Sequence, residues 1–146
     1  AYEIPKRDWS SDVCSSDLQE AIRDEGLLAN VRAMGALLEK GLRARLGQHP
    51  HVGDIRGRGL FWAIELVRDR DDKQPFDPAL AVNERIKREA FARGLACYPM
   101  GGTIDGRLGD HVILAPPYVA SASDIEAIID RFDAATRAAL GSVHAD

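Results

Sequence analysis

Apolar side chains recur at intervals of three and four residues along positions 22–46, and this spacing is the strongest constraint on the fold. The residues concerned are Ile22, Leu27, Leu28, Val31, Met34, Leu37, Leu38, Leu42 and Leu46. They would lie along one side of an α-helix, so other elements must cover them. Gly26 is predicted to interrupt the helix, leaving a longer part over about Leu27–Leu46 that Gly47 and Pro50 terminate.

Short segments with strand and helix patterns follow this helix. Residues 52–59 and 60–67 are rich in strand formers and meet at a glycine-marked bend, which predicts two strands. A second helix is expected over residues 79–93, with Asp77 as its N-cap before Pro78 and Gly94 at its end. Residues 95–98 and 111–115 predict two further strands that pair across a glycine-rich loop at 99–110.

A last helix is expected over residues 124–140, opened by a capping box of Ser123 and Glu126, and the tail at 141–146 should fray. The order is therefore helix, two strands, helix, two strands, helix, with no internal repeat. It predicts an α+β domain in which a small antiparallel or mixed sheet has helices packed on one face.

Residues 1–18 have no apolar period and contain the Ser/Asp repeat SSDVCSSD. Fifteen of their codons, for residues 1–4 and 8–18, can be written to match the constant parts of a short-read sequencing adapter. We therefore predict a non-native leader at 1–18 that takes no part in the fold, and one domain at 19–146. Its reading frame would then start at a broken DNA end, making it a C-terminal fragment. A natural Ser-rich tail is the alternative.

Composition excludes several classes of function. With 19 basic and 23 acidic residues the net charge is -4, so no basic excess attracts nucleic acid. The apolar runs fall far short of the roughly 20 residues that span a bilayer. The sequence has no secretory signal and only 2 cysteines, which favours a cytoplasmic protein without a disulfide framework.

Two glycine-rich segments hold candidate site residues. At residues 56–59, RGRG, one interpretation is an anion contact by an arginine beside a bend, and the other is a strand bulge with solvated arginines. The spacing of a phosphate-binding loop is absent. At residues 101–111 the loop either faces substrate or is a plain surface hairpin.

The other reactive side chains do not form a catalytic set. Cys97 has apolar neighbours, which favours a buried structural thiol over a nucleophile. His49 and His51 have no metal-binding partner motif, so no metal site is predicted. His111 next to Asp110 is more typical of a pair that positions the fold than of a catalytic dyad.

Several blocks together resemble the C-terminal small domain of class III aminotransferases, which are pyridoxal phosphate (PLP) enzymes that include omega-amino acid:pyruvate transaminases. The blocks are His49-Pro50, VGDIRGRGL at 52–60, AIELV at 63–67, Gly94-Leu95, GDHV at 109–112 and LAPP at 114–117. They span nearly all of residues 19–146 with their spacings intact. In this family the segment at 56–60 is structural.

The resemblance implies a fold type I homodimer that moves an amino group from an amine or omega-amino acid to a keto acid such as pyruvate. It also implies that the Schiff-base lysine and the other PLP contacts of the family lie upstream of Gln19. Lys40, Lys73 and Lys87 do not fit the role of that lysine, since each lies on a polar helix face or in a charged loop. No cofactor-binding or catalytic residue is therefore predicted here, and the chain alone should be inactive.

One substrate contact of the family would fall within this chain. Relatives carry a carboxylate-binding arginine before a Pro-x-Gly in the strand after the Gly-Leu pair, and this sequence has Tyr98 there. The loop is longer than in those relatives, and Arg107 within it is the candidate replacement. Tyr98 and Arg107 are thus the predicted substrate-binding residues.

A free-standing, non-catalytic α+β binding or interaction domain is the alternative function. Such a domain should bury its own apolar faces. The apolar side of the helix at 27–46 is instead expected to pack on a neighbour outside the chain. The sequence thus favours the aminotransferase.

Overall fold

The computed structural model describes residues 11–141, with side chains from residue 17 onward. Its elements are α1 (Ser11–Asp24), α2 (Leu27–Leu46), β1 (Val52–Arg58), β2 (Phe61–Leu66), the 3-10 helix η1 (Pro78–Leu80), α3 (Val82–Ala92), β3 (Tyr98–Gly101), β4 (Asp110–Leu114) and α4 (Ala122–Gly141). Apart from η1 and the start of α1 at Ser11, this is the predicted order, and the α+β class is confirmed.

The four strands form one sheet in the order β1-β2-β4-β3, and every neighbouring pair is antiparallel. β1 and β2 form a hairpin with the two-residue connection Gly59-Leu60, and Gly59 has the positive φ of 58° that the first position of a type II′ turn requires. The expected pairing of the two later strands is confirmed, since Tyr98 lies opposite Ile113.

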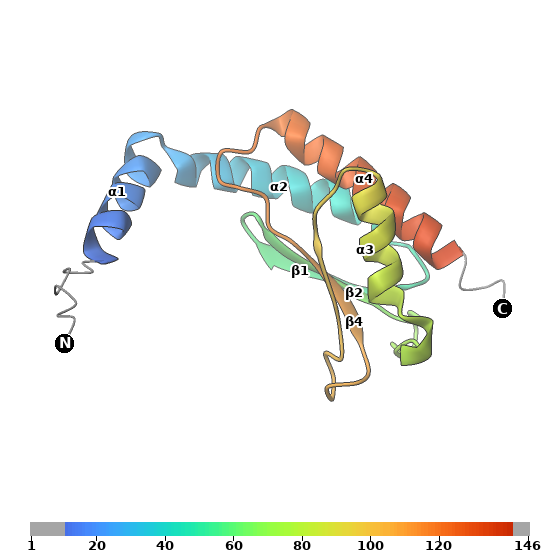
Figure 1. Ribbon diagram of the computed structural model, residues 1–146. Coiled ribbons are helices and arrows are strands. Elements are labelled where there is room, and N and C mark those ends of the chain that lie inside the picture. The colour runs from blue at the N-terminus through green and yellow to red at the C-terminus, as the bar shows by residue number, and fades with distance from the viewer. Residues whose placement is uncertain (1–10, 142–146) are drawn as a thin grey trace, which may run out of the picture.

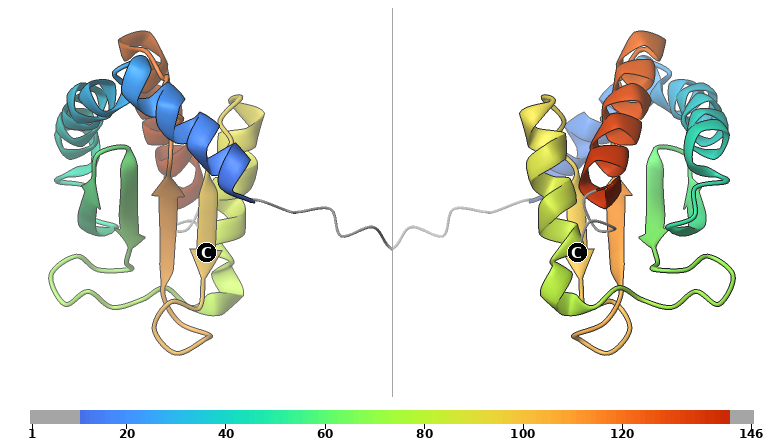
Figure 2. Two further views of the ribbon diagram at one scale, coloured as in Figure 1. Left: turned by 90° about the vertical axis from the view of Figure 1, so that its left-hand side faces the viewer. Right: turned by 90° about the vertical axis from the view of Figure 1, so that its right-hand side faces the viewer.

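Helices α2, α3 and α4 form a layer on one face of this sheet (Figures 1 and 2). Alternate residues of the strands point into that layer, among them Ile64 and Val112, which are fully buried. The apolar side of α2 packs against the core, and its side chains Leu38, Leu42 and Leu46 are all at 0% exposure. The expectation that α2 needs a neighbour outside the chain is therefore wrong for these residues, because α4 and the sheet cover them.

Gly26 separates α1 from α2 as predicted, and its φ of 64° explains why a glycine stands there. α1 extends away from the helix layer (Figure 1). Since α1 begins at Ser11, it joins part of the predicted leader to residues 19–24 in one helix. Residues 1–10 of that leader, and residues 142–146 of the predicted fraying tail, lie outside the described residues.

The predicted helix at 79–93 is two helices. Asp77 does act as an N-cap, because its Oδ1 accepts a hydrogen bond from the Ala79 N–H at 2.9 Å, but the helix it caps is η1. Ala81 then takes a left-handed conformation with φ 46°, and α3 begins at Val82. The single helix was wrong because a left-handed residue ends one helix before the next can start.

The predicted strand at 95–98 is displaced, since β3 covers Tyr98–Gly101. The residues before it complete the end of α3. The Leu95 N–H donates to the Ala90 carbonyl at 2.9 Å and the Gly94 N–H to the Phe91 carbonyl at 2.9 Å, with Gly94 at φ 73°. This is a Schellman ending, so the backbone of Leu95 serves the helix rather than the sheet.

The predicted capping box of α4 has the right form but the wrong residues. The Ser121 N–H donates to Asp124 Oδ2 at 2.9 Å, and the Asp124 N–H donates to Ser121 Oγ at 3.3 Å. Helix α4 therefore begins at Ala122, two residues closer to the prolines than the pair Ser123 and Glu126 predicts. Ser121 and Asp124 have the same three-residue spacing as that pair.

Helix α2 touches the β1–β2 turn at two glycines. A Cβ atom added to Gly35 would lie 2.4 Å from the carbonyl oxygen of Gly59. The indole Nε1 of Trp62 donates to the same oxygen at 2.7 Å, which holds the turn against the helix. The helix and the sheet can thus approach this closely only because residue 35 has no side chain.

We expect Gly35→Ala to lower the free energy of unfolding by about 1–2 kcal/mol, because the overpacking cost exceeds the gain in helix propensity. Urea unfolding followed by circular dichroism measures the change. Gly141→Ala is the matched control, since a Cβ there meets no atom within 4 Å. A Gly35→Ala variant as stable as the parent chain would contradict the close approach.

Candidate functional site

The two arginines of the RGRG segment have different surroundings. Arg56 Nη1 lies 2.8 Å from Glu65 Oε2 and 3.0 Å from Asp54 Oδ2, and these two carboxylates raise the pKa of Arg56. Within residues 17–141, whose side chains are described, Arg58 has no ion-pair or hydrogen-bond partner and is exposed. The segment thus contains one arginine tied to its own sheet and one available for an anion.

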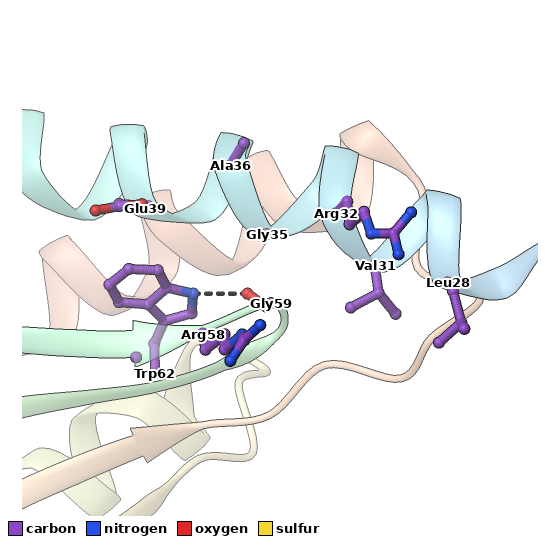
Figure 3. A pocket seen from close by; sticks show the side chains of 10 residues that line it. Leu28, Val31, Arg32, Gly35, Ala36, Glu39, Arg58, Gly59 and Trp62 are labelled. Atoms are coloured by element: carbon purple, nitrogen blue, oxygen red, sulfur yellow. Dashed lines mark hydrogen bonds between the residues drawn. The ribbon is translucent and has the colours of Figure 1, made fainter.

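Arg58 lies on the wall of a groove of about 500 Å³ between α2 and the β1–β2 turn (Figure 3). The opposite wall carries Arg32 on α2, which also lacks a charged partner among the described side chains. Leu28 and the half-buried Val31 give the groove apolar surface, and Trp62 lies buried beside the turn. Glu39 is on the same wall, but its Oε1 is bound by Arg43 Nε at 2.9 Å. The two unpaired guanidinium groups therefore set the charge of the groove.

The loop between β3 and β4 is internally bonded. Backbone hydrogen bonds join the Thr103 N–H to the Gly109 carbonyl at 3.2 Å and the Ile104 N–H to the Leu108 carbonyl at 2.9 Å. Thr103 Oγ1 also lies 2.7 Å from His111 Nδ1 on β4. At the tip, the carboxylate of Asp105 accepts the N–H groups of Leu108 and Arg107, which lowers the pKa of Asp105.

The two predicted substrate residues lie at opposite ends of the β3–β4 hairpin. Tyr98 begins β3 on the open face of the sheet and is 62% exposed. Arg107 lies in the loop after Gly101, so three strand residues, or about 10 Å, separate that loop from Tyr98. The structure does not bring them together. Like Arg58, the exposed Arg107 guanidinium has no partner among the described side chains.

Asp110 and His111 do not form a dyad, because consecutive strand residues point to opposite faces. Asp110 is 8% exposed and accepts a hydrogen bond from the Asn83 backbone N–H, near the start of α3. Burial raises the pKa of Asp110 despite that bond. The N-cap residue of α3, Ala81, has no side chain that could accept a hydrogen bond from the first turn. The carboxylate of Asp110, on the distant strand β4, therefore caps α3 by accepting from the Asn83 N–H. These contacts support the interpretation that Asp110 and His111 position the fold rather than act as a catalytic dyad.

Cys97 is half-buried, and burial raises the pKa of its thiol to about 11. Its position beside the helix ending, next to Leu95, gives it no histidine or carboxylate hydrogen-bond partner among the described side chains. A thiol that stays protonated at neutral pH is a poor nucleophile. The structural role predicted for Cys97 is therefore the one its surroundings favour.

The described residues do not fit a PLP site. A lysine that binds the cofactor lies in a closed site with a carboxylate and an anion-binding group beside it. Lys40, Lys73 and Lys87 are all exposed, and Lys87 pairs with Glu84 at 3.6 Å. No group of three metal-ligating side chains is assembled within the described part of the chain, and none of its helices is long and apolar enough to cross a membrane.

Comparison with known proteins decides the family. The family model for aminotransferase class-III matches residues 12–136, which is most of the chain. The chain belongs to the class III aminotransferases. An aminotransferase of Gibberella zeae is 41% identical over 86% of this chain and 25% of its own length, and a hypotaurine/taurine–pyruvate aminotransferase of Paracoccus denitrificans is 33% identical over 85% of this chain and 26% of its own.

Solved structures agree with this assignment. An omega-transferase from Vibrio fluvialis JS17 superposes with a TM-score of 0.77 at 31% identity, over 87% of this chain and 28% of that protein. The predicted family and fold class are confirmed. This class III chain thus spans about a quarter of the length of the relatives that it matches. The family match begins at residue 12, inside the predicted leader.

Because the pKa of Cys97 in the folded chain exceeds that of an unfolded cysteine, its thiolate is disfavoured and its reactivity should keep rising as pH increases toward about 11. In a Cys14→Ser variant we expect iodoacetamide to label Cys97 at pH 8 at least about tenfold more slowly than the urea-unfolded chain. Mass spectrometry measures the rate. A reactivity midpoint at or below the ordinary cysteine pKa would contradict a buried thiol.

Proposed function

We propose that this chain is the C-terminal small domain of a PLP-dependent aminotransferase that moves an amino group from an amine or omega-amino acid to a keto acid such as pyruvate. The match of the class III family model over residues 12–136 carries the proposal. The Paracoccus denitrificans relative is named for hypotaurine, taurine and pyruvate, which is the same class of substrates. The working enzyme would be a cytoplasmic homodimer.

PLP would be held by the part of the enzyme outside this chain, since the lysines described here are exposed. When bound, PLP supplies the electron sink for amino-group transfer. We further propose that residues 1–18 are a non-native leader and that the coding sequence continues upstream of Gln19.

Within this chain, the β3–β4 hairpin is the element suited to meet a substrate carboxylate. Tyr98 exposes its side chain on the open sheet face at one end of the hairpin. Arg107 presents an unpaired guanidinium at the other end, on a loop that Thr103, Asp105 and His111 hold in shape. An ordered loop loses little entropy on binding, which favours a bidentate contact from Arg107.

Amplifying the source DNA across the codon for Gln19 tests the proposal. We expect an open reading frame of several hundred codons that encodes a lysine-bearing cofactor domain. Its purified product should form alanine from pyruvate and an amine or omega-amino acid donor such as taurine. The 146-residue chain alone should form none. If the locus encodes residues 1–18 directly after a start signal, a cofactor-free binding domain replaces the aminotransferase.

In that full-length enzyme, we expect Arg107→Ala to raise the apparent KM for the keto acid by about tenfold or more, because one charge-assisted contact is lost. Arg107→Lys should recover only part of the loss, since lysine cannot make the bidentate contact. Arg88→Ala, at an exposed arginine on α3 instead of the hairpin, is the control and should leave KM unchanged. An unchanged KM in Arg107→Ala rejects the role of Arg107.

A further inference from the structure

The groove between α2 and the β1–β2 turn holds two of the four arginines whose guanidinium groups lack a partner within residues 17–141. Those four are Arg32, Arg58, Arg88 and Arg107. Arg32 extends from the helix wall and Arg58 from the turn wall (Figure 3). The chain as a whole has a net charge of -4, so a groove with two unpaired positive charges is opposite in sign to the chain's net charge.

The fold keeps these two charges unneutralised. Glu39, the acidic side chain that lines the groove, is engaged by Arg43. Asp54 and Glu65, the acidic residues nearest in the hairpin, are engaged by Arg56. Two like charges on one groove repel each other until an anion lies between them, so binding of a carboxylate group there is favoured.

The groove also has apolar surface and a rigid base. Leu28, 52% exposed, and the half-buried Val31 give the apolar surface at one end, and Trp62, only 3% exposed, lies at the base beside the turn. The contact of Gly35 with Gly59 and the hydrogen bond from Trp62 to Gly59 fix the walls relative to each other. A small inorganic anion would contact the arginines but leave Leu28 and Val31 uncovered in a groove of about 500 Å³.

From this arrangement we propose that the groove is a docking site for an acidic peptide segment, with its carboxylates on Arg32 and Arg58 and its apolar side chains against Leu28 and Val31. Arginine is suited to this role because its planar fork binds carboxylates in a bidentate manner. The proposal is independent of the aminotransferase activity, since none of these residues belongs to the β3–β4 hairpin.

Fluorescence of Trp62 tests the proposal on the 146-residue chain. A Trp9→Phe variant leaves Trp62 as its one tryptophan. The probe is a capped six-residue peptide that alternates aspartate or glutamate with leucine, and the control peptide has asparagine and glutamine at the acidic positions. We expect saturable binding of the acidic peptide, weakened by salt, and at least about tenfold weaker binding of the amide peptide.

Matched variants assign the binding to the groove. Arg32→Gln and Arg58→Gln should each weaken peptide binding by about tenfold, whereas Arg88→Gln on α3 should leave it within twofold. All of these arginines are exposed, and thermal unfolding verifies that the variants fold. Equal effects of Arg88→Gln and Arg58→Gln would overturn the proposal, because they would indicate general charge attraction.

Two further outcomes would also reject it. If sodium sulfate alone saturates the same signal and competes as strongly per carboxylate as the peptide, the groove is a small-anion site. If sedimentation shows self-association of the chain that Arg58→Gln abolishes, the occupant is a second copy of the chain. Retention of the acidic peptide by a chain that remains monomeric supports the proposal.

Discussion

Within residues 11–141, helices cover one of the two faces of the sheet, and the positions of the other elements follow from that constraint. Helices α2, α3 and α4 all lie on the face that carries Ile64 and Val112. Antiparallel sheets tolerate this arrangement because their second face can carry polar side chains. The open face accordingly holds the Arg56–Glu65 pair and the exposed Tyr98. Polar groups that could meet a ligand are thus collected on the open face and in the turns.

The same constraint divides neighbouring polar residues between a structural and a surface role. Asp110 points into the helix layer and binds the start of α3, while His111 points outward and contacts Thr103 in the loop. In the RGRG segment, Arg56 is held by carboxylates of the hairpin, whereas Arg58 at the turn is not. Residues that look equivalent in a motif therefore differ in function because of where each side chain points.

Local patterns predicted most of the fold. The three-four spacing of Leu38, Leu42 and Leu46 located α2. Strand-forming residues on either side of glycine-marked turns located both hairpins, although β3 starts later than predicted. These signals depend on short local segments. The errors fall where backbone conformation or a tertiary partner decides. Ala81 is left-handed, Leu95 completes a Schellman ending, and Ser121 rather than Ser123 caps α4. Neither Asp110 as a remote cap nor Arg32 as a groove residue had a signal in the sequence, since each depends on elements distant along the chain.

The strand order has a consequence for how this chain reaches its native state. β2 pairs with β4 rather than with β3, so Trp62 aligns with Leu114, 52 positions further along the chain. Pairings between segments this far apart require costly loop closure and slow the search. The two hairpins and α3 form from local contacts, whereas the central β2–β4 ladder joins them. We therefore expect this ladder to complete the sheet late in folding, and only after β4 has been synthesised.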